Sequence, residues 1–202
     1  MNTTTDEQLL ADYLAGDKLA FRRLVERHHR ELYQFVFRFT GSAAAAEDVV
    51  QETFVQVHMA AETFDPDRKL KPWLFTIGAN KARDYLRGRA RRKEVPLDAP
   101  LGGDGEPGGQ RFFDLMADEG PMPTDHLETK EQAEIVRKIV QEMPPTLREV
   151  LVLAYFHHFP YKEMAEMLRI PLGTVKSRLH SAVGYFGEQF RKAQNLSEQH
   201  DV

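Results

Sequence analysis

The residues best suited to binding chemistry in this chain are arginines spaced along one predicted helix, which begins near Pro72 and continues to about Arg92. On a helical wheel at 100° per residue, Asn80, Arg83 and Arg87 share one face. Arginines suit phosphate groups, which supply salt-dependent affinity, and an asparagine on the same face can read a base edge. A solvated basic face that complements the helix dipole is the alternative. The density of charge beside aromatic residues favours nucleic acid.

Aromatic side chains accompany this basic helix. Phe64 precedes it, and Trp73, the only tryptophan, stands at its start. Aromatic rings beside a basic groove can stack on unpaired bases. We expect Phe75 to lie in the core. For Trp73, core packing and stacking on a base are both open.

A second polar face follows residue 172. Tyr161–Leu168 is predicted to form a short helix, residues 169–172 a break, and Gly173 the opening of another helix. One side of that helix is apolar and comprises Val175, Leu179, Ala182, Val183, Phe186 and Phe190. The opposite side is small, polar and partly cationic, and comprises Gly173, Lys176, Ser177, His180, Ser181, Gly184 and Gly187. This pattern is typical of a helix-turn-helix whose second helix enters a major groove, although helical bundles contain similar pairs.

A third face is acidic. On a predicted helix from Ala43 to about Ala60, Asp48, Gln51 and Glu52 lie at positions i, i+3 and i+4 and therefore share one side. Carboxylates would repel phosphates, so this side suits a basic protein partner. An ordinary solvated helix face is the alternative.

The elements that must position these faces are all helical, because no alternating strand pattern occurs. Thr5 or Asp6 can cap a first helix, Asp17 a second that ends at Gly41, and Ser42 the third. Later helices are expected at 125–142 and from Pro144-Pro145 onward. We therefore predict an all-α chain with the following organisation: a helical domain at 1–93, a flexible acidic linker at 94–124, a helix-turn-helix domain at 125–194 and a tail at 195–202.

The distribution of charge and the composition of residues 94–124 support this division into two domains and a linker. The net charge of −4 conceals +8 within residues 67–93 and −9 within residues 94–134. A chain pI near 6 is thus compatible with nucleic-acid binding. Residues 94–124 contain 6 glycines and 5 prolines, a composition that cannot pack a core.

The sequence contains no pattern typical of an enzyme or of a cofactor site. Cysteine is absent, and we find no phosphate-binding glycine motif and no nucleophile with a base. The pairs His28-His29 and His157-His158 face different ways on a helix and are expected to be solvated or packed, so no metal or other cofactor is expected. No apolar run approaches the roughly 20 residues that span a bilayer. We expect a cytoplasmic protein without membrane insertion.

Four ordered stretches resemble bacterial RNA polymerase sigma factors, and most closely the extracytoplasmic-function (ECF) group. They are GDKLAFRRLVERHHRELY, AAEDVVQETFVQV, FDPDRKLKPWLFTIGANKARDYLR and MPPTLREVLVLAYFHHFPYKEMAEMLRIPLGTVKSRL. The resemblance implies a region 2 bundle in the first domain and a region 4 helix-turn-helix in the second. It also implies a factor that binds core polymerase through the β and β′ subunits, recognises promoter DNA, drives strand opening and is held inactive by an anti-sigma protein.

The resemblance also implies roles for individual residues. The polymerase interface is assigned to Asp48, Gln51 and Glu52. Contacts to the −10 element are assigned to Phe64, Trp73, Asn80, Arg83 and Arg87. Contacts to the −35 element are assigned to Lys176, Ser177, His180 and Ser181. Two departures stand out: Gly78 predicts a bend or close packing, and the few basic residues at 181–184 predict altered −35 recognition.

Two other functions are compatible with parts of the pattern. A stand-alone helix-turn-helix regulator would bind duplex DNA as a dimer, with half-sites one helical turn apart. An adaptor would use the acidic and basic faces to dock proteins only. Transcription with purified core polymerase separates both from a sigma factor.

Overall fold

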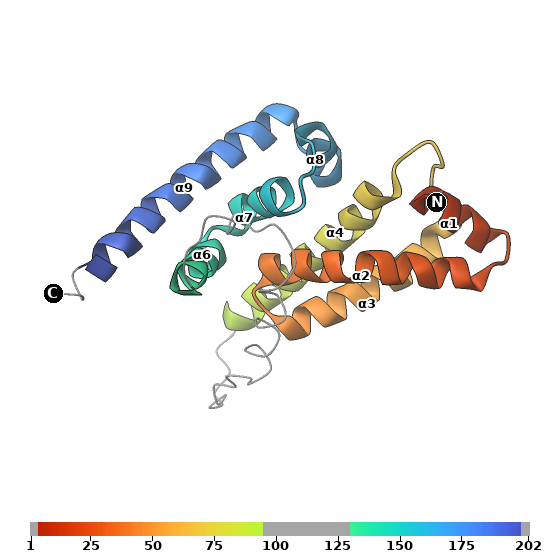
Figure 1. The fold of residues 1–202 in the computed structure, drawn as a ribbon, viewed down its shortest axis with the longest axis horizontal. Coiled ribbons are helices and arrows are strands. Elements are labelled where there is room, and N and C mark those ends of the chain that lie inside the picture. Colours follow the sequence, from red (N-terminus) through yellow and green to blue (C-terminus); the bar gives the residue numbers. More distant parts are fainter. Residues whose placement is uncertain (1–3, 95–129, 199–202) are drawn as a thin grey trace.

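The structure is a computed structural model that describes residues 4–94 and 130–198, and every regular element in those two ranges is helical (Figure 1). The first range forms the N-terminal unit, with α1 (Asp6–Leu14), α2 (Lys18–Thr40), α3 (Ala43–Ala60), the 3-10 turn η1 (Ala61–Thr63) and α4 (Leu70–Glu94). The second forms the C-terminal unit, with α6 (Lys130–Glu142), α7 (Pro145–Leu151), the π-helical segment η3 (Val152–Phe156), α8 (Tyr161–Leu168) and α9 (Leu172–Glu198). The all-α prediction is confirmed.

The predicted linker at 94–124 lies outside the described residues except for Glu94. The same holds for the start of the helix expected at 125–142, which is described from Lys130. Part of the predicted tail is helical, because α9 continues to Glu198. None of the described helices is long and apolar enough to cross a membrane.

The helix boundaries follow the capping residues in the sequence. The side chains of Thr5, Asp17 and Ser42 accept hydrogen bonds from backbone N–H groups in the first turns of α1, α2 and α3. At the other end of α2, Gly41 adopts φ 73°, a left-handed conformation that costs glycine little. Arg169 ends α8 with φ 53° and lacks that freedom. Local chemistry therefore sets the boundaries of the first three helices.

The core of the N-terminal unit lies between α2, α3 and α4. Phe35, Phe39 and Phe75 are fully buried there, which confirms the core placement of Phe75. Gly78 permits a close approach of α4 to α2, because a Cβ atom at this position would lie 2.8 Å from Leu32 Cδ1. Of the two outcomes expected from this glycine, the structure shows close packing.

The C-terminal unit packs on one side of the N-terminal bundle, so one apolar core runs through both (Figure 1). Phe75 of α4 meets Phe159, with ring centroids 5.0 Å apart. Arg148 of α7 is buried and donates hydrogen bonds to the carbonyl oxygens of Phe39 (2.8 Å) and Met143 (2.9 Å). These bonds tie the last turn of α2 to the α6–α7 junction. The two units therefore form a joint structure within the described residues.

Candidate nucleic-acid interface

The predicted basic side of α4 is accessible in the structure. Asn80 and Arg87 are exposed and Arg83 is partly exposed; these three residues are called the α4 face below. Asn80 Oδ1 accepts a hydrogen bond from Arg83 (2.7 Å), and Arg87 pairs with Asp84 one turn earlier. The helix thus holds one amide and two guanidinium groups on one side, which suits contacts to phosphates and a base edge.

The two candidate stacking rings lie against each other beside the start of α4. Phe64 follows η1, Trp73 lies in the first turns of α4, and their ring centroids are 5.0 Å apart. Both are partly buried, and Trp73 contacts the apolar clusters on either side of it. The rings form the apolar end of the surface that continues along the α4 face.

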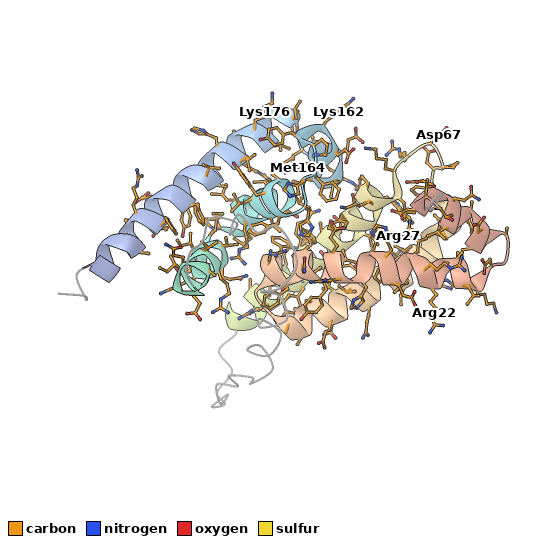
Figure 2. All side chains as sticks on the ribbon, in the orientation of Figure 1. Arg22, Arg27, Asp67, Lys162, Met164 and Lys176 are labelled. Atoms are coloured by element: carbon orange, nitrogen blue, oxygen red, sulfur yellow. The ribbon has the colours of Figure 1, made fainter. Side chains whose placement is uncertain are left out.

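The helix-turn-helix consists of α8 and α9. Lys176, Ser177, His180 and Ser181 are all exposed on α9, while its opposite side is buried against α6, α7 and α8. Figure 2 shows Lys176 of α9 and Lys162 of α8 at the same edge of the view, both pointing outward. The sequence analysis did not single out Lys162, an exposed residue at the start of α8. In helix-turn-helix proteins the first helix of the motif crosses the DNA backbone.

One assignment to the apolar side of α9 is wrong. Val175, Leu179 and Ala182 are buried as expected, but Val183 is 45% exposed. It lies about 80° around the helix from Val175, at the margin of the apolar arc. Phe186 and Phe190 are partly buried, with stacked rings 5.7 Å apart.

The acidic side of α3 is a separate surface. Asp48, Gln51 and Glu52 are exposed, and together with Val55, Gln56 and Lys81 they line a depression. Lys81 of α4 donates a hydrogen bond to Glu52 (3.2 Å). The exposed apolar residues Val55 (58%) and Met59 (73%) extend this surface. Sequence reasoning did not single them out, although their spacing places them on the same side of the helix as Glu52.

The adjacent histidines behave as two buried and two exposed groups. His28 Nε2 lies 2.7 Å from Asp6 Oδ2, and His157 Nδ1 lies 3.4 Å from Glu31 Oε1. His29 and His158 are exposed. Within residues 4–94 and 130–198 no cluster of three potential ligands occurs. The buried histidines serve packing and hydrogen bonding.

Ionisable groups are concentrated where the two units meet. Burial raises the pKa of Glu149 to about 7, although Arg83 and Arg178 oppose the rise. Burial also tends to raise the pKa of Glu31, but hydrogen bonds from His157 and Lys71 outweigh it and lower that pKa to about 2.

Burial lowers the pKa of His157 despite its contact with Glu31. At neutral pH the junction therefore contains an ionised Glu31, a neutral His157 and a Glu149 near its titration midpoint.

Comparison with known proteins identifies the family. Residues 24–92 match Sigma-70 region 2, and residues 133–183 match Sigma-70, region 4. The ECF RNA polymerase sigma factor SigW of Bacillus subtilis is 31% identical over 176 residues, which cover 87% of this chain and 91% of SigW. The ECF RNA polymerase sigma-E factor of Escherichia coli K12 is 31% identical over 179 residues, covering 88% of this chain and 90% of that protein.

Solved structures agree with this family. The structure of CnrH in complex with the cytosolic domain of CnrY matches with a TM-score of 0.65 and 26% identity, and the match covers 93% of this chain and 97% of that one. The sigma factor RpoE of Bartonella quintana, solved with the anti-sigma factor NepR, shares the fold with a TM-score of 0.62, 21% identity and coverage of 85% and 96%. The chain belongs to the extracytoplasmic-function RNA polymerase sigma factors.

Proposed function

We propose that this sigma factor docks on core RNA polymerase through the acidic side of α3 and reads a promoter with two other surfaces. The α4 face and the Phe64–Trp73 pair contact the −10 element, and the exposed side of α9 contacts the −35 element. The observation that carries this assignment is the separation of surfaces by charge. The docking surface displays Asp48 and Glu52, whereas the two DNA surfaces display arginine, lysine, histidine, amide and hydroxyl groups.

Docking is expected on a basic surface of the β′ subunit, with further contacts to the β subunit. Carboxylates at the rim would steer the approach, and the exposed Val55 and Met59 would supply apolar area at the contact. The fold gives this surface a rigid support, because Val49, Val50 and Phe54 anchor the other side of α3 in the core.

Promoter opening on this proposal needs no covalent chemistry, so we assign the chain no enzymatic activity. Arg83 and Arg87 position the phosphate backbone, and Asn80 reads a base edge. An unpaired base that stacks on Trp73 or Phe64 stabilises only the opened duplex, so binding energy favours strand separation. On α9, Lys176 and His180 act with the two serines in the major groove.

The cellular location follows from the partner, because a chain that acts with RNA polymerase works in the cytoplasm. An anti-sigma protein is proposed as a further partner, since the structures of CnrH and of RpoE each contain a second protein bound to the sigma factor. We assign region 2 to residues 1–93 and region 4 to residues 125–194, with the acidic segment 94–124 as the connector through the polymerase.

The test is selection of DNA from a random pool by the purified chain, with and without core polymerase. A pair of separated, non-palindromic motifs recovered only with polymerase supports the proposal. A palindromic duplex recovered by the chain alone would instead indicate a stand-alone helix-turn-helix regulator. Binding to polymerase without enrichment of any DNA would indicate an adaptor.

A further inference from the structure

The start of α4 is capped by a side chain from a different helix. The first N–H groups of an α-helix have no partner within the helix, and a side chain just before it usually accepts from one of them. Lys69 precedes the first residue of α4, Leu70, and its ammonium group has no acceptor atom. The N–H of Leu70 donates instead to Glu7 Oε1 of α1 at 2.8 Å, although the two residues are 63 positions apart in sequence. A carboxylate in this place also faces the positive end of the α4 dipole.

Helix α1, which carries Glu7, is held on the bundle at both of its ends. Asp6 Oδ2 lies 2.7 Å from His28 Nε2 of α2. At the other end, the hydroxyl oxygen of Tyr13 lies 2.5 Å from His58 Nδ1 of α3. The position of Glu7 is therefore set by contacts with α2 and α3, and the cap transmits that position to α4.

The same helix supports the two candidate stacking rings from below. Leu9 and Leu10 of α1 and Leu70 of α4 are each 1% exposed and belong to one apolar cluster. Phe64 and Trp73 pack against this cluster. Trp73 follows Leu70 by three positions, so the two residues lie on the same side of α4. A displacement of Leu70 would therefore change the orientation of the Trp73 ring.

We propose that Glu7 is a positioning residue: through the backbone of Leu70 it orients Trp73 for stacking on an unpaired base of the −10 element. The proposal rests on the function proposed above for the Phe64–Trp73 pair. None of the residues assigned above to DNA or to polymerase lies on α1. The cap orders the first turn of α4 before a base arrives, so less conformational freedom is lost on binding. Only the opened strand offers an unpaired base, so Glu7 should favour opened promoter DNA over the duplex.

The test compares holoenzymes that contain the native chain or Glu7→Ala on two forms of a promoter selected by the native holoenzyme. One form is fully duplex and is kept on ice, and the other carries mismatches that open the −10 element. Glu7→Ala should bind the opened form about tenfold more weakly, which is within the range of one base-stacking contact, and should bind the duplex form as the native chain does. Equal losses on the two forms, or no loss on either, would overturn the proposal.

Three further variants separate positioning from a general loss of stability. Asp12→Ala removes another carboxylate of α1, whose hydrogen bond from Gln8 (2.8 Å) is local to that helix, and should change neither affinity. Tyr13→Phe removes the contact with His58 at the far end of α1, and should lower the urea midpoint but keep the ratio of the two affinities. Glu7→Gln should fall between the native chain and Glu7→Ala, because an amide oxygen still accepts a hydrogen bond but carries no charge. A changed ratio for Tyr13→Phe, or a loss for Glu7→Gln as large as for Glu7→Ala, would contradict the role of the cap.

A double-mutant cycle tests whether Glu7 acts through Trp73. In a Trp73→Ala background, Glu7→Ala should cause no further loss on the opened promoter, because the ring that the cap orients is absent. Additive losses would show that Glu7 acts by another route and would overturn the proposal.

Failure of this proposal is distinguishable from failure of the proposed function. A loss for Trp73→Ala on the opened promoter with none for Glu7→Ala overturns the positioning role alone. Unchanged binding by Trp73→Ala overturns the stacking role of the ring and the positioning role together.

Discussion

Glu149 should make the stability of this protein depend on pH in an unusual direction. Glu149 is 4% exposed; its carboxyl group lies 3.3 Å from Arg83 Nε of α4 and also interacts with the charge of Arg178 on α9. Its pKa rises from 4.5 to about 7, chiefly because burial disfavours the charged form. Between pH 4.5 and pH 7 the folded protein therefore keeps Glu149 protonated to a greater extent than the unfolded chain does. Stability conferred by protonated Glu149 is present below pH 4.5 and is lost as the pH rises toward 7.

The size of the loss follows from the two pKa values. At 1.36 kcal/mol for each tenfold change in proton affinity, the ionised form above pH 7 costs about 3 kcal/mol of unfolding free energy. His157 acts in the opposite sense, because its lowered pKa makes stability rise as the pH approaches 6.5. Above pH 6.5 the contribution of His157 is constant, so the remaining fall belongs to Glu149.

The assay is urea unfolding of the native sequence and of Glu149→Gln at intervals from pH 5 to pH 8. Glutamine keeps the shape of the side chain and cannot ionise, so the difference in unfolding free energy isolates the titration. The variant should gain on the native sequence as the pH rises, by up to about 3 kcal/mol. His157→Gln provides a comparison, because its difference in unfolding free energy from the native sequence should vary with pH only below about pH 6.5. Parallel pH profiles for Glu149→Gln and the native sequence would refute the reasoning.

Three further predictions concern the interfaces and the core. Replacement of Arg83 and Arg87 by alanine should weaken holoenzyme–promoter complexes and reduce the logarithmic salt slope by roughly 1.8, measured by filter binding across salt concentrations. Reversal of Asp48 and Glu52 to lysine should abolish polymerase binding in a pull-down while the circular dichroism spectrum is retained. Gly78→Ala should lower the unfolding free energy by about 1–2 kcal/mol in urea titration, because the new methyl group meets the buried Leu32.

Each of these predictions has a matched control. Arg22→Ala removes an exposed arginine of α2 and should leave the salt slope unchanged. Glu26→Lys reverses an exposed carboxylate on α2 and should leave polymerase binding intact. Gly184→Ala adds a methyl group to α9 where nothing lies within 4 Å, and should stabilise by up to about 1 kcal/mol. An unaltered salt slope for the Arg83/Arg87 variant, polymerase binding by the reversed α3, or equal effects of the two glycine substitutions would each contradict the corresponding reasoning.

The features that sequence analysis predicted are those set by neighbouring residues. Thr5, Asp17 and Ser42 cap helices because their side chains reach backbone groups two or three positions away. Helical periodicity placed Asp48 and Lys176 on exposed sides, and the structure agrees. Such patterns are local and are legible without knowledge of the tertiary fold.

The features that sequence analysis did not predict depend on contacts between distant segments. Arg148 and the carbonyl oxygen of Phe39 lie 109 residues apart in sequence, and nothing near either residue indicates the partner. The sequence around Glu149 is that of an ordinary charged residue in a short helix, and nothing in it indicates the contact with Arg83. Val183 was misplaced because a wheel shows its angle on α9 but not how far the covering helices extend.

The central claim is that this chain gives core RNA polymerase its promoter specificity. The most direct measurement is run-off transcription with purified core polymerase on a template that carries the DNA selected by the holoenzyme. We expect a transcript of defined length only when the chain is added, with loss of the product for the Asp48/Glu52 reversal and for replacement of Arg83 and Arg87 by alanine. Initiation that is independent of the chain, or full activity of both variants, would contradict it.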